Sequence, residues 1–200
     1  MMKNREDRSQ ESGELHPVHK HHDGYFNTIS GTKVSIHNPT KDMILIEDIA
    51  HALSNLCRFG GHTERFYSVS QHCILTMKLA ESDGHSPDLQ LFALMHDASE
   101  AYVQDLIKPV KYIVGKPYEL IEDRFEFIIC SNFNLNDSTE NRILVKEYDK
   151  TALELEHEYF FKQNRAAFLH WNQYGVYPPE IAKRNFLSHF HRLKKEVSNE

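Results

Sequence analysis

Apolar residues recur three and four positions apart from about residue 39 to the end of the chain, and this spacing constrains the fold more than any other feature. Such spacing places apolar side chains along one face of an α-helix. We therefore predict six amphipathic helices, over about 46–56, 68–83, 87–98, 120–129, 138–162 and 178–193. Gly60-Gly61 is expected to end the first of these helices, and Pro109 and Pro117 are expected to mark the connection to the fourth.

The residues before the first predicted helix follow other patterns. From Tyr25 to about Asn38, apolar residues around Gly31 predict a short β-hairpin. Residues 1–24 are polar and lack an apolar period, so they are predicted to form a disordered tail. Four of the 14 histidines lie there and are interpreted as solvated: His16, His19, His21 and His22. The expected fold is all-α, or mainly so, with one helical domain over residues 25–200 and a small N-terminal β-hairpin.

Composition excludes several classes of protein. The chain has 200 residues, a net charge of −6 and no dense run of lysine and arginine, which argues against binding to duplex nucleic acid. It contains no run of about 18 apolar residues and no apolar segment near its start, so neither a transmembrane helix nor a secretory signal is expected. Its three cysteines form no Cys-x-x-Cys pair, which argues against disulfides and a cysteine-rich zinc site. These features favour a cytoplasmic protein.

The residues that point to chemistry begin with His96 and Asp97, which follow the apolar residues 91–95 of the third predicted helix. Burying an ionised aspartate there costs several kcal/mol unless a cation or hydrogen bonds compensate. Glu100 follows three residues after Asp97 and projects on the same side of a helix, and Asp105 comes as that helix ends. A divalent cation would relieve the repulsion among these acids, and an acid that holds no cation and has a raised pKa is suited to accept a proton.

A histidine–aspartate pair is common by itself, but here the preceding helix carries His72 and a later helix carries Asp149. One histidine, a His-Asp pair and a distant aspartate, all from separate helices, form the pattern of the HD-domain metal-dependent phosphohydrolases, which this chain resembles. The stretch from His96 to Lys111 is similar to the bacterial HD-type deoxynucleotide 5′-nucleotidases. The stretch 48–69 is similar to phage and bacterial HD proteins, among them the phage dATP triphosphohydrolases of the diaminopurine-DNA pathway. The resemblance covers about residues 29–160.

The resemblance implies an HD-type helical bundle and assigns roles to individual residues. The implied ligands of a divalent cation, which would be Zn, Co or Mn, are His72, His96, Asp97 and Asp149. The implied catalytic residues are Glu100, which would orient or deprotonate the attacking water, and Asp105, which would support it. The implied substrate and phosphate contacts are Arg58, Phe59, His62, Lys111 and Lys146. Phe59 stands where relatives that prefer adenine or lack a base preference often carry tryptophan.

The activity implied by the resemblance is metal-dependent hydrolysis of a deoxynucleoside triphosphate, with dATP favoured. Attack at the α-phosphorus would give the deoxynucleoside and triphosphate. The alternative is a 5′-nucleotidase that breaks the same bond in a deoxynucleoside monophosphate, and the third possibility is a nucleotide-binding HD module without turnover. The implied partner is a small deoxynucleotide, rather than duplex nucleic acid or a membrane, in the cytoplasm, or in the host cytoplasm if the protein is phage-encoded.

Related HD proteins form dimers or hexamers, so a homo-oligomer is expected. The apolar residues of the last predicted helix are explained equally by a subunit contact or by the core: Ile181, Phe186 and Phe190. Four further aromatic residues are expected in the core or in a subunit contact: Phe160, Phe161, Trp171 and Tyr174.

Overall fold

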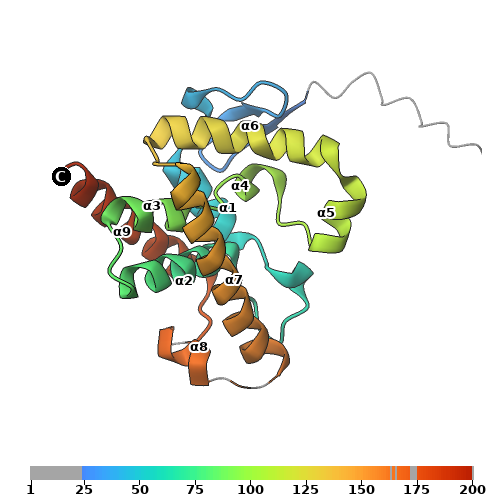
Figure 1. Cartoon of the computed structure of the whole chain (residues 1–200). Coiled ribbons are helices and arrows are strands. Elements are labelled where there is room, and N and C mark those ends of the chain that lie inside the picture. Colours follow the sequence, from blue (N-terminus) through green and yellow to red (C-terminus); the bar gives the residue numbers. More distant parts are fainter. Residues whose placement is uncertain (1–23, 163, 165, 172–174, 200) are drawn as a thin grey trace, which may run out of the picture.

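Helices make up most of the protein and a two-stranded antiparallel sheet lies at its N-terminal end, which confirms the predicted fold class. The structure is a computed structural model that describes residues 24–162, 164, 166–171 and 175–199 (Figure 1). Its elements are β1 (Tyr25–Asn27), β2 (Lys33–Ser35), η1 (Lys41–Met43), α1 (Ile46–Asn55), η2 (Phe59–Gly61), α2 (Val69–Ser82), α3 (Pro87–Met95), α4 (Glu100–Val103), α5 (Lys108–Val114), α6 (Lys116–Phe133), α7 (Thr139–Phe161), α8 (Ala166–Trp171) and α9 (Pro179–Val197), where η denotes a 3₁₀ helix.

The hairpin is fixed to α1 by a buried carboxylate. β1 and β2 pair antiparallel, with Phe26 opposite Val34, as predicted. The Asp48 carboxylate of α1 accepts hydrogen bonds from Thr28 Oγ1 (2.7 Å) and from the backbone nitrogen (3.0 Å) and Oγ (2.7 Å) of Ser30. Asp48 is almost fully buried, so these hydrogen bonds replace those that water would make. The turn of the hairpin is therefore tied to the N-terminal half of α1.

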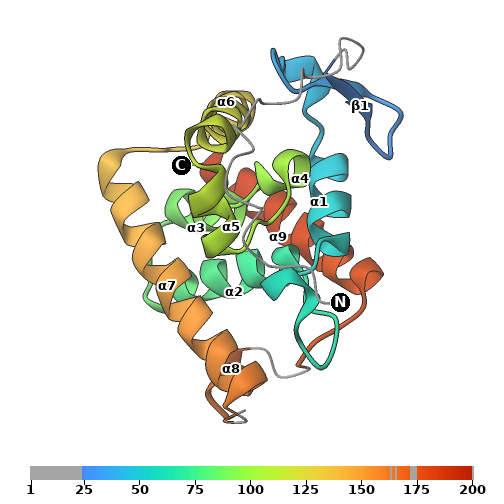
Figure 2. The same cartoon turned by 90° about the vertical axis from the view of Figure 1, so that its right-hand side faces the viewer.

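The core forms around α2, which packs against α3, α7 and α9 (Figure 2). Nearly every residue of α2 between Val69 and Ala80 is buried, because apolar side chains lie on all sides of this helix. The last helix, α9, packs against α1 and α3 and places Phe186 and Phe190 in the same core. Core packing therefore explains the apolar face of α9.

The first helix ends earlier than the glycines predict. α1 stops at Asn55, and the chain then pairs like a strand, since the backbone nitrogen of Arg58 donates to the carbonyl oxygen of Tyr67 (2.9 Å). Gly60-Gly61 instead forms part of η2, where both glycines have positive φ. The helix therefore stops within one residue of the predicted range, but Gly60-Gly61 does not end it, because strand-like pairing replaces helical hydrogen bonds before those residues.

The third predicted helix is divided in two. α3 ends at Met95 and α4 begins at Glu100, so His96 and Asp97 lie between the two helices. The backbone nitrogen of Ala98 donates to the carbonyl oxygen of Met95, and that of Glu100 donates to the carbonyl oxygen of Asp97 (each 3.0 Å). These bonds span three residues rather than four, as in a 3₁₀ turn. The expectation that the histidine and both acids share one α-helix is therefore wrong.

Three short helices, α4, α5 and α8, were not predicted from the apolar spacing. Pro109 and Pro117 lie in the first turns of α5 and α6 rather than in a loop. Proline suits these positions because the first turn of a helix needs no backbone N–H donor. The prolines predicted to mark a connection therefore begin helices.

Some predictions concern residues outside the described part of the chain. Of the predicted polar tail, residues 1–24, all but Gly24 lie outside the described residues, as do Tyr174 and the side chain of Trp171. Of the remaining aromatic residues, Phe160 is partly buried and packs against Tyr67, whereas Phe161 is exposed. Within the described ranges, no helix has both the length and the hydropathy needed to cross a bilayer.

Candidate metal centre

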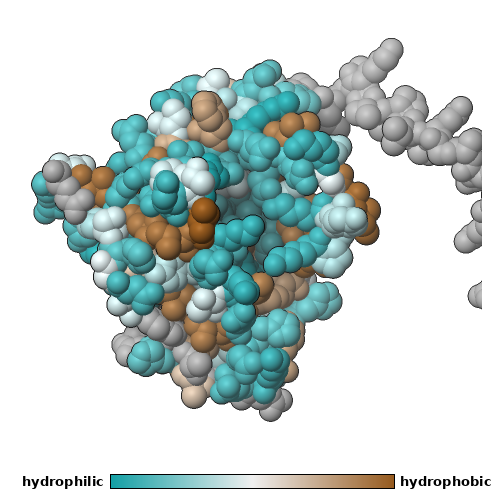
Figure 3. Space-filling model, viewed as in Figure 1, coloured by the Kyte–Doolittle hydropathy of each residue, from teal (hydrophilic) through white to brown (hydrophobic). Residues whose placement is uncertain are grey.

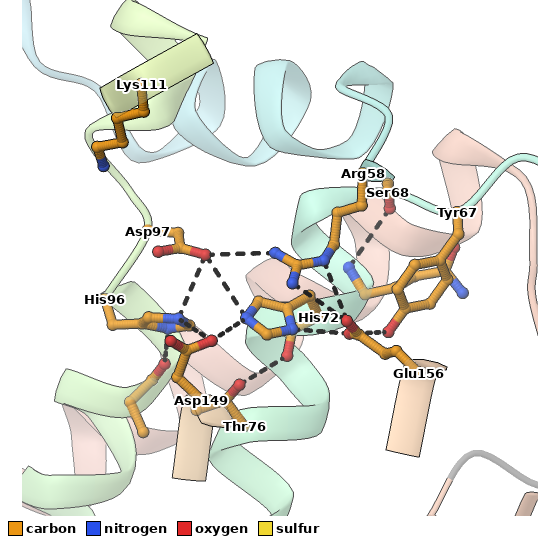
Figure 4. A network of polar contacts seen from close by, with 12 residues as sticks. Arg58, Tyr67, Ser68, His72, Thr76, His96, Asp97, Lys111, Asp149 and Glu156 are labelled. Atoms are coloured by element: carbon orange, nitrogen blue, oxygen red, sulfur yellow. Dashed lines mark hydrogen bonds and ion pairs between the residues drawn. The ribbon is translucent and has the colours of Figure 1, made fainter. Parts of the chain in front are cut away.

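His72 lies on α2 and is fully buried. Its Nδ1 lies 2.7 Å from Oε1 of Glu156, a carboxylate on α7. Because an ionised carboxylate only accepts hydrogen bonds, the neutral imidazole carries its proton on Nδ1 and its lone pair on Nε2. That Nε2 faces the carboxylate oxygens of Asp149 (3.0 Å) and Asp97 (3.6 Å), as Figure 4 shows.

His96 is oriented in the same way. Its Nδ1 lies 2.8 Å from the carbonyl oxygen of Ala93, so this nitrogen donates and the lone pair of the neutral ring lies on Nε2. Nε2 lies 3.2 Å from Oδ2 of Asp97 and 3.9 Å from Oδ1 of Asp149. The Nε2 atoms of both His72 and His96 are buried, and neither forms a well-aligned hydrogen bond with the described residues.

A divalent cation fits this donor set, because two imidazole lone pairs and two carboxylates face one another. One ligand atom from each of His72, His96 and Asp97 lies within 4.8 Å of the other two. Ligands held at about 2.0–2.1 Å around a tetrahedral zinc lie about 3.3 Å apart, which is close to the nitrogen–oxygen separations in this cluster. The four residues predicted as ligands therefore lie together, and their nitrogen and oxygen atoms suit Zn, Co or Mn.

The two aspartates of the cluster favour their ionised forms. Burial would raise the pKa of Asp97, but the adjoining His96 and the more distant His72 lower it below its ordinary value. Burial also opposes ionisation of Asp149, whereas His72 at 3.0 Å and His96 lower its pKa in their protonated forms, which they adopt when no cation is bound. Ionised carboxylates are the form that binds a cation.

The predicted catalytic acids, Glu100 and Asp105, show the opposite tendency. Burial, followed by the negative charges of Asp97 and Asp105, raises the pKa of Glu100 to about 10. Its Oε2 is buried and is hydrogen-bonded to none of the described residues. Burial also raises the pKa of Asp105. Without a bound cation, Glu100 therefore holds a proton at neutral pH, and the predicted role of proton acceptor requires a cation that lowers this pKa.

Sequence reasoning missed Glu156, which is fully buried and has more hydrogen-bond partners than the other acids described at this site. Its Oε1 accepts from the Tyr67 hydroxyl (2.9 Å) as well as from His72, and its Oε2 accepts from Arg58 Nε (3.2 Å) and lies 3.1 Å from Arg58 Nη2. A signal was present in the sequence, because Glu156 follows Asp149 by seven residues. That spacing puts both side chains on one face of a helix, two turns apart.

Arg58 and Lys111, both predicted to contact phosphate, lie near Asp97. Arg58 is 9% exposed, and its Nη1 lies 3.7 Å from Oδ2 of Asp97. Lys111 lies on the other side of Asp97 (Figure 4), and its Nζ donates to Glu122 (2.8 Å). Burial opposes the charge of Lys111, but Glu122 and the more distant Glu100 raise its pKa. The positively charged side chains of Arg58 and Lys111 therefore lie on two sides of Asp97.

The other three residues predicted to contact substrate have no described contact with the four candidate ligands. Phe59 lies in η2 with a positive φ of 56°, which is unusual for a residue other than glycine, and its ring centre lies 5.5 Å from the Arg58 guanidinium. His62 is exposed at the end of η2, and Lys146 is exposed on α7. The structure thus places Phe59 beside Arg58 but does not place His62 or Lys146 at the cluster.

The surface is hollowed on the side of the molecule drawn in Figure 3. The hollow lies near the centre of that view, in the region where Figure 1 places α4 and α7, and hydrophilic residues form most of its rim. A polar depression between elements that carry Glu100 and Asp149 is a suitable entrance for a charged small molecule.

Comparison with curated proteins gives relatives without a described activity. The chain is 39% identical over 111 residues to the uncharacterized protein YfdR of Escherichia coli strain K12, a match that covers 56% of this chain and 59% of that protein. It is 37% identical over 111 residues to the uncharacterized protein RCAP_rcc00048 of Rhodobacter capsulatus, covering 54% of this chain and 57% of that protein. The chain thus spans less than two thirds of the length of these relatives. No protein-family model matches it.

Proposed function

We propose that this protein is an HD-type metal-dependent phosphohydrolase that cleaves a deoxynucleoside triphosphate, with dATP favoured, to the deoxynucleoside and triphosphate. One observation carries the proposal. The Nε2 atoms of His72 and His96 and a carboxylate oxygen of Asp97 lie within 4.8 Å of one another, and Asp149 lies 3.0 Å from His72. This is the set of four residues that the resemblance to HD phosphohydrolases implies.

These four residues would hold a divalent cation, which supplies polarisation of a phosphoryl oxygen and a lowered pKa of water. Glu100, whose place beside the cluster supports the role, would take the proton of the attacking water once the positive charge of the cation has lowered its pKa. The water oxygen forms a bond to the α-phosphorus, the bond from phosphorus to the 5′ oxygen breaks, and that oxygen leaves with a proton. Arg58 and Lys111 offset the negative charge of the phosphoryl oxygens, and Asp105 supports Glu100.

The substrate is tested by digestion of a panel of deoxynucleoside triphosphates and monophosphates with Zn, Co or Mn, followed by identification of the products. We expect dATP to yield deoxyadenosine and intact triphosphate. Release of inorganic phosphate from monophosphates, with no triphosphate from dATP, would instead support the 5′-nucleotidase. Binding of nucleotide without turnover of any member of the panel would support a binding module.

The role of Glu100 is tested by Glu100→Ala. We expect turnover to fall by about 10²–10⁴-fold, the usual contribution of a general base, while cation and nucleotide still bind. Equal activity in the variant would remove Glu100 from the mechanism.

The proposal includes self-association in the cytoplasm. α5 buries none of its residues and exposes Tyr112 (88%) and Ile113 (81%), and the following helix, α6, exposes Phe127 (70%). Apolar patches of this kind on a protein surface are commonly covered by a partner. The start of α6 carries the exposed cation of Lys116 and the exposed anion of Glu119, and a surface bearing both signs can match a second copy of itself about a twofold axis.

A further inference from the structure

Glu156 is a buried charge with all of its acceptor positions in use. Its two oxygens face four donor atoms of three side chains: His72, Tyr67 and Arg58. The Arg58 guanidinium forms an ion pair with this carboxylate, with Nη2 at 3.1 Å from Oε2, and His72 Nδ1 lies 2.7 Å from Oε1. This one side chain therefore touches both a candidate metal ligand and a candidate phosphate contact.

We propose that Glu156 is a positioning residue that joins the two halves of the site, by fixing His72 for the cation and Arg58 for the phosphate. The inference rests on the proposed function. It goes beyond that function because it predicts that loss of one carboxylate, which would touch neither cation nor substrate, weakens the binding of both.

The first half of the inference concerns His72. Glu156 Oε1 takes the Nδ1 proton at 2.7 Å, which leaves Nε2 as the nitrogen that faces Asp149 and His96. A carboxylate behind a ligating imidazole fixes the tautomer and the ring orientation and makes the ligand nitrogen more basic. Without it, the ring of His72 could rotate or carry its proton on Nε2, and either change removes the lone pair from the cluster.

The second half concerns Arg58. Its Nε and Nη2 face Glu156, so the edge of the guanidinium that remains for an anion is the one bearing Nη1, which lies 3.7 Å from Asp97. Because Arg58 is almost fully buried, the guanidinium has no room to turn toward solvent. Glu156 therefore decides which nitrogens of Arg58 point toward the cluster.

A buried arginine–glutamate pair can also have a purely structural role. The two roles predict different results. If the pair is only structural, loss of Glu156 lowers the stability of the fold but leaves the affinities of the folded protein unchanged. If Glu156 positions both partners, the affinities for cation and phosphate fall together in protein that is still folded.

The experiment compares Glu156→Gln with Glu154→Gln, a matched change at an exposed position of the same helix. The amide at position 156 turns an NH₂ donor toward groups that are themselves donors, so it cannot accept all the bonds of the carboxylate. The dissociation constant of Co²⁺ is measured by competition with a chelator. The affinity for inorganic phosphate is measured by calorimetry with Co²⁺ saturating, and circular dichroism confirms the fold.

We expect Glu156→Gln to weaken Co²⁺ binding by about 10–100-fold, the usual effect of removing a carboxylate behind a ligating histidine. Phosphate binding should weaken as well, and Glu154→Gln should leave both constants unchanged. Unchanged Co²⁺ binding in Glu156→Gln overturns the inference alone. If the unaltered protein binds no Co²⁺, the proposed function fails and this inference fails with it.

Two further measurements keep the test decisive if Glu156→Gln does not fold. Glu156→Asp keeps the charge but shortens the side chain by one methylene, so it cannot reach all three partners, and we expect weakened Co²⁺ binding. Equal affinity in this variant would overturn the inference. In the cation-free unaltered protein, the Nδ1–H of His72 should give a downfield NMR signal typical of a proton held by a carboxylate, and its absence would overturn the inference too.

Discussion

Arg58 and Glu156 form an ion pair that is almost fully buried, and this pairing leads to a prediction about stability. Arg58→Met keeps most of the side-chain volume but leaves the Glu156 carboxylate buried without its cation. We expect the free energy of unfolding to fall by about 3–5 kcal/mol, the usual cost of removing one partner of a buried pair. Urea denaturation of the cation-free protein measures the change.

Arg142→Met is the matched control. Arg142 forms ion pairs with Glu126 and Asp137 at the surface, where solvent screens them. Its replacement should change the free energy of unfolding by less than about 1 kcal/mol. Similar losses of unfolding free energy in the two variants would show that burial does not increase the contribution of the Arg58–Glu156 pair to stability.

At the scale of single residues, the sequence predicted the four candidate ligands but not their surroundings. His72, His96, Asp97 and Asp149 could be selected because their types and order match a known pattern. Glu156 was missed because glutamate is usually exposed, and its burial depends on which face of α7 meets α2. The position of a long flexible side chain such as that of Lys146 cannot be predicted from helical spacing.

At the scale of elements, the attachment of the hairpin to α1 is open to test. Asp48→Ala removes the acceptor of three hydrogen bonds from Thr28 and Ser30. We expect the hairpin to open more readily by at least about 2 kcal/mol, which corresponds to at least roughly 30-fold faster amide exchange, since even one bond to a charged acceptor contributes about 1.5–3 kcal/mol. Hydrogen exchange at Phe26 and Val34 measures the effect.

The control for the hairpin is Asp42→Ala, which removes an exposed acid from η1. Exchange in the hairpin should not change in this variant, and exchange in α2 should not change in either. If Asp48→Ala left hairpin exchange unaltered, the carboxylate would have no part in holding it.

Long helices were predicted better than short ones. α2 and α7 have an extended apolar pattern and a serine that caps the first turn, Ser68 and Ser138 respectively. α4, α5 and α8 are too short to show a helical period, so nothing in the sequence distinguished them from loops. The predicted end of α3 was wrong because a 3₁₀ turn replaces α-helical bonds there, and Gly60-Gly61 does not end α1 because strand-like pairing begins before it.

At the scale of the molecule, a bound cation would connect α2, the turn after α3, and α7. The folded protein alone assembles these ligands, so the cation should stabilise it by about 2.7 kcal/mol at a concentration 100-fold above its dissociation constant. For a chain of this size we expect a rise in Tm of about 5–10 °C. Thermal unfolding with Co²⁺ and then with EDTA measures the rise and its reversal.

Two histidine variants complete that experiment. His72→Ala should abolish the rise in Tm, because it removes a ligand from the centre of the cluster. His157→Ala removes an exposed histidine from α7 and should preserve the rise. A rise that persisted in His72→Ala would place the cation elsewhere on the protein.

The proposed contact between copies is tested on α5. Ile113→Glu replaces an exposed apolar side chain of α5 with a charged one and should shift the protein toward monomer in sedimentation measurements. Ile29→Glu, a change at an exposed position of the hairpin, should have no effect. A monomeric unaltered protein would contradict the proposed self-association.

The fold class followed from composition and spacing, but the arrangement of the helices did not. Apolar periodicity indicates which face of a helix is buried and does not indicate which helix covers it. The meeting of His72 with Asp149, which lie on α2 and α7, was inferred from a family pattern. Physical reasoning on the residues alone indicated only that the buried acids need a cation or hydrogen bonds to compensate their charge.

Because two carboxylates of α7 contact His72, a movement of this helix would separate the candidate ligands. Asp149 lies at one nitrogen of the imidazole and Glu156 at the other, so two turns of a single helix, about 10.5 Å of its length, hold the ring from both edges. A slip or rotation of α7 by one register position would withdraw both carboxylates together. The two carboxylates that contact His72 are therefore gained or lost together, because both depend on the position of α7.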